Sequence, residues 1–226
     1  MALSQSLAHN VEIEIAMTSI GKFISVEGGE GVGKSTQIAA LAAAIRQRGH
    51  TVVITREPGG TSGAEAIRQL LLTGADRKWA PRAEALLFAA ARSDHVERLI
   101  RPAIAAGTWV ISDRFLDSSR AYQGGGSGLS DEDIMTLHRI GSETMVPNRT
   151  LVLELPEAQA LARAAKRDDG KSDRIGGRDR DFHSKVHDSF VRYAKLDPVR
   201  VRIVDASGEP AEVTGRLMSE IADLLQ

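Results

Sequence analysis

The sequence predicts a doubly wound, three-layer α/β domain built around one parallel sheet of five strands. Five short segments rich in β-branched residues alternate with longer segments of helical pattern along the chain. Each short segment is apolar almost throughout, which is typical of strands that helices cover on both faces. This alternation indicates one domain with β-α-β connections and no second domain. The predicted strands are 22–27, 51–55, 108–112, 149–155 and 199–204.

The loop after the first predicted strand has the pattern of a phosphate-binding loop. Its residues are Gly28, Gly29, Glu30, Gly31, Val32, Gly33, Lys34, Ser35 and Thr36, and a helix with an apolar face at Ile38, Leu41, Ala42 and Ile45 follows. Backbone N–H groups of such a loop and the N-terminus of the next helix bind phosphate oxygens. Lys34 is expected to reach the β- and γ-phosphates, and Ser35 to ligate Mg²⁺. The loop therefore predicts binding of a nucleoside triphosphate.

The second predicted strand is followed by the segment Arg56-Glu57-Pro58-Gly59-Gly60-Thr61. An arginine at the carboxyl end of a parallel strand lies at the edge where open α/β sheets bind ligands. Its planar guanidinium suits a phosphate monoester. Taken alone, the segment is equally consistent with a turn that carries a solvated arginine.

A long helix is predicted over 81–106, with Pro81 in its first turn. Phe88 and Arg92 are four residues apart and share one face of this helix. An aromatic ring beside a cation can stack on a nucleobase and hydrogen-bond its edge. The alternative is a core phenylalanine next to an exposed arginine.

The third predicted strand ends at Asp113, which is followed by Arg114 and Phe115. Asp113 has the position of a Walker-B carboxylate, which holds Mg²⁺ through water. A salt bridge between Asp113 and Arg114 is the structural alternative, but neighbours on a strand point to opposite faces. A GTPase switch needs a guanine-reading Asn-Lys-x-Asp segment and an Asp-x-x-Gly directly after the third strand, and the chain has neither there, since its third predicted strand ends in Asp113-Arg114-Phe115.

Two later segments interrupt the alternation of strands and helices. The first, Gly124-Gly125-Gly126-Ser127-Gly128, predicts a flexible surface loop between helices. The second, 166–181, is densely charged and has no apolar face. Its composition is that of a solvated connection. In a phosphate-handling enzyme, a mobile arginine-rich segment of this kind can serve as a lid that closes over the reacting phosphates.

The composition sets limits on partners and location. The net charge is −1, so no positive field exists to attract nucleic acid or an anionic membrane. The absence of cysteine fits a cytoplasmic protein. Residues 1–19 lack the basic start and apolar core of a signal peptide, and we expect a disordered leader or a non-native start there. His183 and His187 are four apart without a carboxylate motif, which favours surface residues over a metal site.

Four segments together resemble the thymidylate (dTMP) kinase family, in the bacterial type that uses lid arginines. They are Phe23 to Thr36, the segment Thr55 to Thr61, Leu86 to Arg92, and Asp113 to Gly124 with its Ala-Tyr-Gln-Gly ending. The resemblance runs in unbroken order from about Gly21 to the C-terminus. It implies the P-loop nucleoside-monophosphate-kinase fold for residues 20–226, with a mobile lid near 166–181. It also implies transfer of the γ-phosphoryl group of ATP to dTMP, with Mg²⁺, and a homodimer that associates through helices.

The same resemblance implies roles for individual residues. Arg56 and Arg114 would bind the acceptor phosphate, and Lys34 with the lid residues Arg174 and Arg167 would stabilise the transferring group. Metal binding would fall to Ser35 and Asp113. The acceptor nucleoside would lie against Glu30, Phe88, Arg92, Ser119, Tyr122 and Gln123. The chain departs from the family at Gly176, where an acidic residue is usual, and this leaves open which lid arginine reaches the phosphates.

Two other functions remain to be separated from this one. The first is a kinase for a different nucleoside monophosphate, which the residues Phe88, Arg92 and Tyr122 argue against. The second is a nucleotide-binding module or switch that transfers no phosphate. An intact Lys34 and the second set of arginines are features that such a module does not need.

Overall fold

Five parallel strands form a single sheet in the order β2-β3-β1-β4-β5. The computed structural model describes residues 20–73, 79–156, 158–160, 163 and 177–226. The strands are β1 (Phe23–Glu27), β2 (Val52–Arg56), β3 (Trp109–Asp113), β4 (Arg149–Glu154) and β5 (Val201–Asp205). They begin and end within two residues of the predicted ranges. The predicted leader at 1–19 lies outside the described residues.

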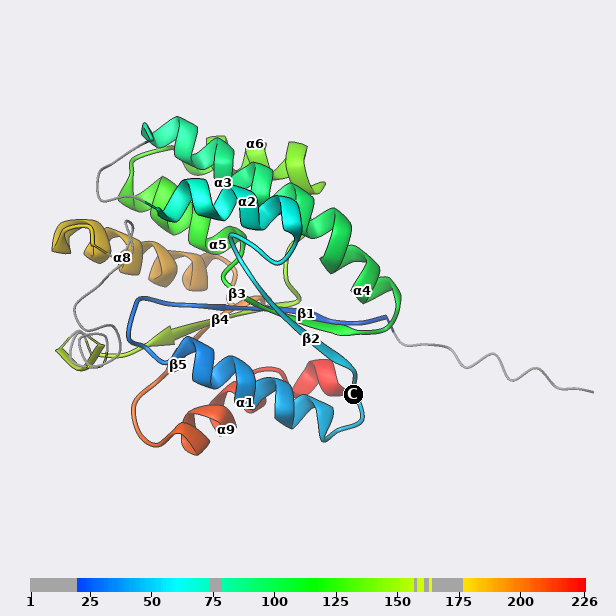
Figure 1. Cartoon of the computed structure of the whole chain (residues 1–226). Coiled ribbons are helices and arrows are strands. Elements are labelled where there is room, and N and C mark those ends of the chain that lie inside the picture. The colour runs from blue at the N-terminus through cyan, green and yellow to red at the C-terminus, as the bar shows by residue number, and fades with distance from the viewer. Residues whose placement is uncertain (1–19, 74–78, 157, 161–162, 164–176) are drawn as a thin grey trace, which may run out of the picture.

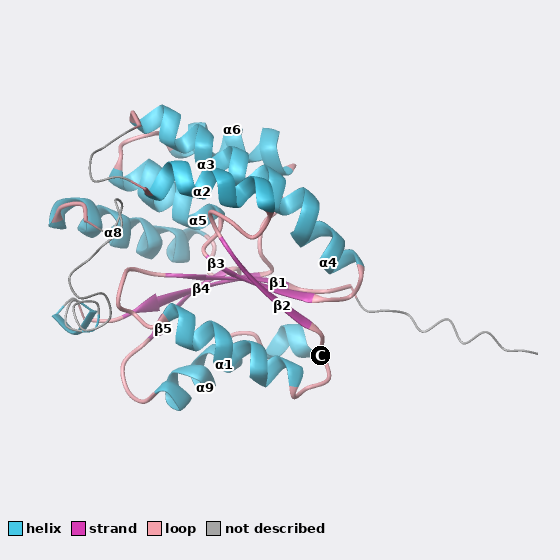
Figure 2. Cartoon of the chain, viewed as in Figure 1, coloured by secondary structure: helices cyan, strands magenta, loops and turns pink. Residues whose placement is uncertain are grey.

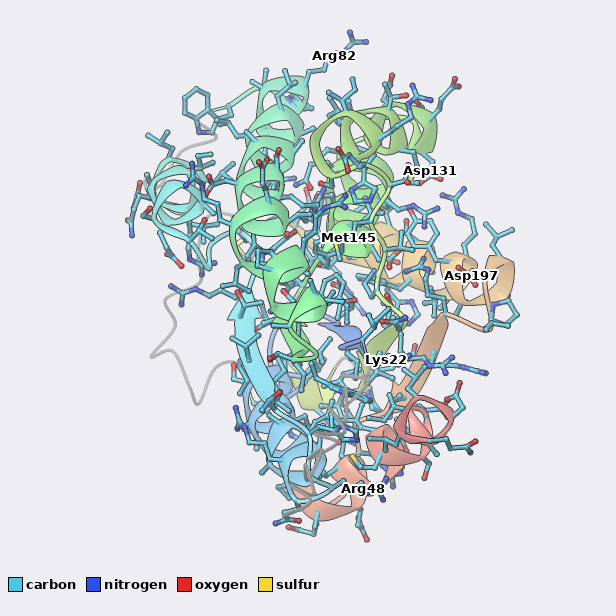
Figure 3. The ribbon with its side chains drawn as sticks, turned by 90° about the vertical axis from the view of Figure 1, so that its right-hand side faces the viewer. Lys22, Arg48, Arg82, Asp131, Met145 and Asp197 are labelled. Carbon is cyan, nitrogen blue, oxygen red and sulfur yellow. The ribbon has the colours of Figure 1, made fainter. Side chains whose placement is uncertain are left out.

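Helices cover both faces of the sheet and form the two outer layers (Figures 1 and 2). One layer contains α1 (Lys34–Arg46) and α9 (Pro210–Ser219). The other contains α2 (Ser62–Leu72), α3 (Pro81–His95), α6 (Asp131–Ser142) and α8 (Arg180–Leu196). Figure 3 shows the two layers from the side, with Arg82 of α3 at the top and Arg48 after α1 at the bottom. This arrangement confirms the predicted three-layer fold.

The sheet supplies the centre of the core on both sides. Ile24 and Val26 of β1 are fully buried, as are Leu41 and Ile45 on the apolar face of α1. On the opposite side, Phe23 packs edge to face against Phe115, with 4.8 Å between the ring centroids. Apolar contact on both faces explains why these strands read as continuous apolar runs rather than alternating ones.

The predicted long helix over 81–106 is continuous but changes its winding. The α-helical part, α3, ends at His95, a π-helical turn η1 covers Val96–Ile100, and α4 covers Arg101–Ala105. Pro102 lies in the first turn of α4 and has no N–H to donate. A wider turn just before it shifts the register without breaking the helix.

The prediction of a flexible loop over Gly124–Gly128 was wrong for most of that segment. Residues Arg120–Gly126 form a π-helix, η2, that packs against α8, and Gly124 is buried. A Cβ atom on Gly125 would lie 2.0 Å from Ser189 Oγ, and one on Gly126 would lie 2.3 Å from the Phe182 ring. These glycines therefore allow close packing of two helices, whereas in the sequence the same run of glycines predicted flexibility.

Among the described residues, no helix is long and apolar enough to cross a bilayer. The carboxyl ends of all five strands meet at one edge of the sheet, on the left in Figure 1. Glu27, Arg56 and Asp113 end three adjacent strands at this edge. The phosphate-binding loop leaves β1 at the same place.

Burial of His138 predicts acid sensitivity of the fold. The side chain is 1% exposed on α6, and burial together with the nearby Arg92 lowers its pKa to about 4. An unfolded chain would bind the proton with a pKa near 6.5. Acid therefore favours the unfolded state, and stability falls as the pH drops from 6.5 toward 4, by about 3 kcal/mol in total.

Replacing this histidine with an apolar residue of similar size should remove that part of the pH dependence of stability. In His138→Leu, the loss of unfolding free energy between pH 7 and pH 4 should be smaller than in the native protein, as measured by urea unfolding. Equal pH slopes for the two proteins would contradict the assignment.

Candidate functional site

The backbone of the phosphate-binding loop requires glycine where it meets β4. Gly28 has a φ of 130°, and a Cβ atom there would lie 2.5 Å from the carbonyl oxygen of Leu153. Gly33, at the N-terminus of α1, has a φ of 94°. Both conformations are strained for residues with a side chain. The loop therefore folds back over the sheet edge, and Val32 anchors it in the core.

Lys34 is held by the loop that it follows. Its ammonium donates hydrogen bonds to the carbonyl oxygens of Gly28, at 3.0 Å, and Gly29, at 2.7 Å. Desolvation, with a further contribution from the nearby Arg114, lowers the pKa of Lys34 to about 7. An anion placed against this group would favour its charged form.

Asp113 and Ser35 fit the requirements of a hydrated magnesium ion. Asp113 Oδ1 is buried and has no hydrogen-bond partner among the described residues. A buried carboxylate oxygen without a donor is a site that a metal-bound water can fill. The exposed Ser35 lines the same cavity. Among the described residues, no group of three or more His, Cys, Asp or Glu side chains is arranged to hold a metal ion.

The larger cavity at this edge has a volume of about 650 Å³. The loop residues and α1 form one wall, and the segment between β5 and α9 forms another. Two of the arginines around it lie in β2 and α2, a third directly follows β3, and a fourth lies after β4. Its lining includes Glu30, Gly31, Val32, Gly33, Lys34, Ser35, Thr36, Arg56, Arg68, Asp113, Arg114, Arg163, Gly208 and Pro210.

A smaller cavity of about 90 Å³ lies next to it. Its lining combines apolar and aromatic side chains with a few polar groups, as is usual for ligand sites. All the residues predicted to contact an acceptor, except Arg56, line it. The lining includes Glu30, Glu57, Pro58, Arg68, Leu72, Phe88, Arg92, Arg114, Phe115, Ser118, Ser119, Tyr122, Gln123 and His183.

Four residues line both cavities, namely Glu30, Glu57, Arg68 and Arg114. The two cavities therefore meet at a boundary that carries two arginines. Arg68 donates to the carbonyl oxygen of Pro58 at 2.7 Å. The predicted phosphate ligand Arg56 lines only the larger cavity, and its exposed guanidinium pairs with Glu65 of α2 at 3.0 Å.

Arg114 is oriented by groups on three sides. It has a φ of 70°, its Nη1 donates to Ser118 Oγ at 3.1 Å, and its guanidinium carbon lies 4.9 Å from the centre of the Tyr122 ring. Behind it, Glu27 accepts hydrogen bonds from the Phe115 N–H, at 2.8 Å, and from Ser118 Oγ, at 2.5 Å. Burial raises the pKa of Glu27 to about 8, although Arg114 and Ser118 favour its carboxylate. The Asp113–Arg114 salt bridge considered from the sequence is not among the described ion pairs.

Arg92 and Gln123 are more buried than the sequence suggested. Arg92 is 2% exposed and pairs with Glu57, which rules out the alternative of an exposed arginine. Gln123 donates to Glu84 at 3.1 Å, and the same carboxylate holds Arg178 at 2.8 Å. Ser119 accepts a hydrogen bond from Arg92. Both predicted polar contacts, Ser119 and Gln123, thus also serve a network within the protein.

Sequence reasoning missed four residues of this site, Glu27, Glu57, Arg68 and Glu84. The available signal for Glu27 was its position at the end of an apolar strand, the same position that marked Asp113. Glu57 was visible only as part of a turn. Arg68 and Glu84 lie in helices, where a charged residue carries no sign of the direction in which it points.

The remaining sequence predictions concern the lid arginines and the histidine pair. Arg167 and Arg174, and most of the predicted lid at 166–181, lie outside the described residues. Of the predicted histidine pair, His183 lines the smaller cavity, whereas His187 hydrogen-bonds Glu154 at the end of β4.

Comparison with known proteins identifies the family. The family model described as thymidylate kinase matches residues 26–216. The chain is 62% identical over 205 residues to a thymidylate kinase of Rhizorhabdus wittichii, covering 91% of this chain and 99% of that one. A thymidylate kinase of Cereibacter sphaeroides is 45% identical, with 92% and 98% covered.

A solved structure agrees with these sequence relatives. The crystal structure of thymidylate kinase from Ehrlichia chaffeensis superposes with a TM-score of 0.70 at 30% identity, covering 91% of this chain and 99% of that one. The chain therefore belongs to the thymidylate kinase family.

Proposed function

We propose that this protein transfers the γ-phosphoryl group of ATP to dTMP and forms dTDP and ADP. The observation that carries the proposal is the meeting of two cavities at Glu30, Glu57, Arg68 and Arg114. One cavity is built on a phosphate-binding loop, and the other is lined by aromatic rings and a buried arginine. Such a pair of sites suits in-line transfer between two nucleotides.

The larger cavity suits the donor ATP. Backbone N–H groups of the loop and the N-terminus of α1 would bind its phosphates, and the Lys34 ammonium would move from loop carbonyls to phosphate oxygens. Ser35 and Asp113 are the residues that would hold Mg²⁺. When bound, the ion would neutralise charge on the phosphates. The loop between β5 and α9, with Gly208 and Glu209, lies at the part of the cavity left for the nucleoside.

The smaller cavity suits the acceptor dTMP. Phe88 would stack on the thymine ring and Arg92 would donate to its carbonyl edge, with Ser119 and Gln123 beside it. Tyr122 would lie against the deoxyribose, where it disfavours a 2′-hydroxyl group, and Glu30 would accept from the 3′-hydroxyl. These assignments agree with the place of each residue in the cavity lining.

The acceptor phosphate would lie at the boundary of the cavities. Arg114 and Arg68 face both sides of this boundary, and Arg56 approaches it from the larger cavity after leaving Glu65. No general base is needed, because a phosphate monoester with a second pKa near 6 is already mostly dianionic at neutral pH. Catalysis then consists of alignment and of positive charge around a loose transition state.

Other features of the proposal extend beyond the cavities. We assign Arg167 and Arg174, outside the described residues, to the phosphates, together with Arg163, which lines the larger cavity. We also propose a cytoplasmic homodimer that associates through the layer of α3 and α6. Leu86 on α3 is 56% exposed and Ile140 on α6 is 75% exposed, and the two helices pack side by side (Figure 1).

The proposed activity can be tested by a coupled assay of ADP release with dTMP, dUMP, dCMP, dGMP and dAMP. We expect the highest kcat/KM with dTMP. Equal or better turnover of a purine nucleotide would overturn the thymidylate assignment. ATP binding without transfer to any monophosphate would indicate a binding module instead.

The Lys34→Ala substitution should lower kcat by about 10²- to 10³-fold, because it removes a cation that stabilises the transferring phosphoryl group. Lys22→Ala is the matched control, since Lys22 lies before β1 at the opposite end of the strand. Steady-state kinetics and thermal unfolding of both variants would check this. Retained turnover in a folded Lys34→Ala protein would remove Lys34 from the mechanism.

The Arg92→Ala substitution should raise KM for dTMP by about 10- to 100-fold and change KM for ATP little, because only the acceptor site loses donors. Arg82→Ala, an exposed arginine on the same helix, is the control and should leave both constants unchanged. A change confined to the ATP constant would refute the assignment of Arg92 to the base.

A further inference from the structure

A chain of buried hydrogen bonds lies behind the smaller cavity and ends at Arg92. Arg92 Nε donates to Glu57 Oε2 at 2.9 Å, and the second oxygen of the same carboxylate lies 3.2 Å from His95 Nδ1. The other ring nitrogen, Nε2, lies 2.6 Å from Thr55 Oγ1. Glu57, Arg92 and His95 are each at most 5% exposed. These hydrogen bonds join the end of β2 to α3.

Hydrogen-bond geometry defines how these groups are connected. Glu57 lies between Arg92 and His95, and His95 lies between Glu57 and Thr55. When the His95 ring donates from Nδ1 to Glu57, its Nε2 can accept a hydrogen bond from the Thr55 hydroxyl group. Glu57, His95 and Thr55 then each have a hydrogen-bond partner within this network. A substitution at any link would leave a buried donor or acceptor unsatisfied.

The network fixes the plane of the Arg92 guanidinium. Nε is held by Glu57, Nη2 donates to Ser119 Oγ at 2.5 Å, and the guanidinium carbon lies 5.4 Å from the centre of the Phe115 ring. Among the described residues, no hydrogen bond uses Nη1. Because Arg92 lines the smaller cavity, this nitrogen is the donor left for a ligand. Its direction depends on the bond between Nε and Glu57.

His95 has no place in that cavity and is fully buried. It lies one helical turn after Arg92 and contacts the far side of the same carboxylate. Gly60 packs directly over it, since a Cβ atom there would lie 2.6 Å from His95 Nε2 and 2.4 Å from Thr55 Oγ1. Apolar packing would be sufficient if the only role of these residues were to hold β2 against α3. The hydrogen bonds of Glu57 with Arg92 and His95 also restrict its carboxylate to one orientation.

We propose that Glu57 and His95 are positioning residues that orient Arg92 toward the base of the acceptor nucleotide. Glu57 acts directly on the guanidinium, and His95 acts through Glu57. This inference rests on the proposed binding of the acceptor base by Arg92. It adds two residues that determine how well the base is bound by orienting Arg92, of which His95 lies outside the cavity lining.

The decisive experiment is a double-mutant cycle with Glu57→Gln and Arg92→Ala, measured as KM for dTMP and for ATP. A glutamine keeps the shape of Glu57, but its amide nitrogen cannot accept from Arg92 or His95. We expect Glu57→Gln to raise KM for dTMP about tenfold and to leave KM for ATP within about twofold. In the Arg92→Ala background, the same substitution should have no further effect on KM for dTMP.

An additive effect in the double variant would overturn the proposal, because Glu57 would then act independently of Arg92. An unchanged KM for dTMP in folded Glu57→Gln would overturn it as well. Failure of the proposed function is recognised separately, since the native protein would then not phosphorylate dTMP. Failure of the base assignment would be recognised in the single Arg92→Ala variant, as a change confined to KM for ATP.

A second pair of variants at His95 keeps the proposal falsifiable if Glu57→Gln does not fold. His95→Asn retains a donor near the position of Nδ1, whereas His95→Leu has a similar size and no donor. We expect His95→Leu to raise KM for dTMP severalfold without affecting KM for ATP, and His95→Asn to restore most of the native value. Equal dTMP constants in the two variants would overturn the role of His95.

Discussion

The parallel alignment of the central strands is the constraint on which the site depends. Because β1, β2 and β3 run in the same direction, their carboxyl ends place Glu27, Arg56 and Asp113 at one edge. Backbone groups at this edge leave the ladder and are free to bind a ligand, and the N-terminus of α1 points there too. The loop after β1 can contact β4 so closely only because Gly28 has no side chain. The larger cavity, the positions of Ser35 and Asp113 in its lining, and the place of Arg56 at this edge all follow from this alignment.

Buried acidic groups behind the arginines form the second level of organisation. Glu57 contacts Arg92, and Glu27 lies behind Arg114 and Ser118. An arginine beside a partly apolar cavity would otherwise be mobile or would turn toward water. A carboxylate at one edge of the guanidinium fixes its plane and leaves the other edge for the ligand. The two arginines differ in that Glu57 accepts directly from Arg92, whereas Glu27 reaches Arg114 through a hydroxyl group, and burial raises the pKa of Glu27 to about 8.

Much of the site could be predicted because its residues are close in sequence to recognisable motifs. Lys34 and Ser35 follow a glycine pattern, Asp113 ends an apolar strand, and Phe88 and Arg92 share a helix face. The wrong prediction at Gly124–Gly128 has a physical cause: glycines that permit close contact between helices look the same in sequence as glycines that permit flexibility. His95 gave no signal either, since its partners Glu57 and Thr55 are about 40 residues away.

The succession of strands and helices along the chain, the phosphate-binding loop and the family resemblance could be predicted from the amino-acid sequence alone. Those features depend on local periodicity and on residue types that backbone geometry requires. Only the tertiary structure decided that two cavities share Arg68 and Arg114, and that buried carboxylates stand behind Arg92 and Arg114. The physical reason is that the direction of a charged side chain is set by desolvation and by partners from distant segments, which no local pattern records.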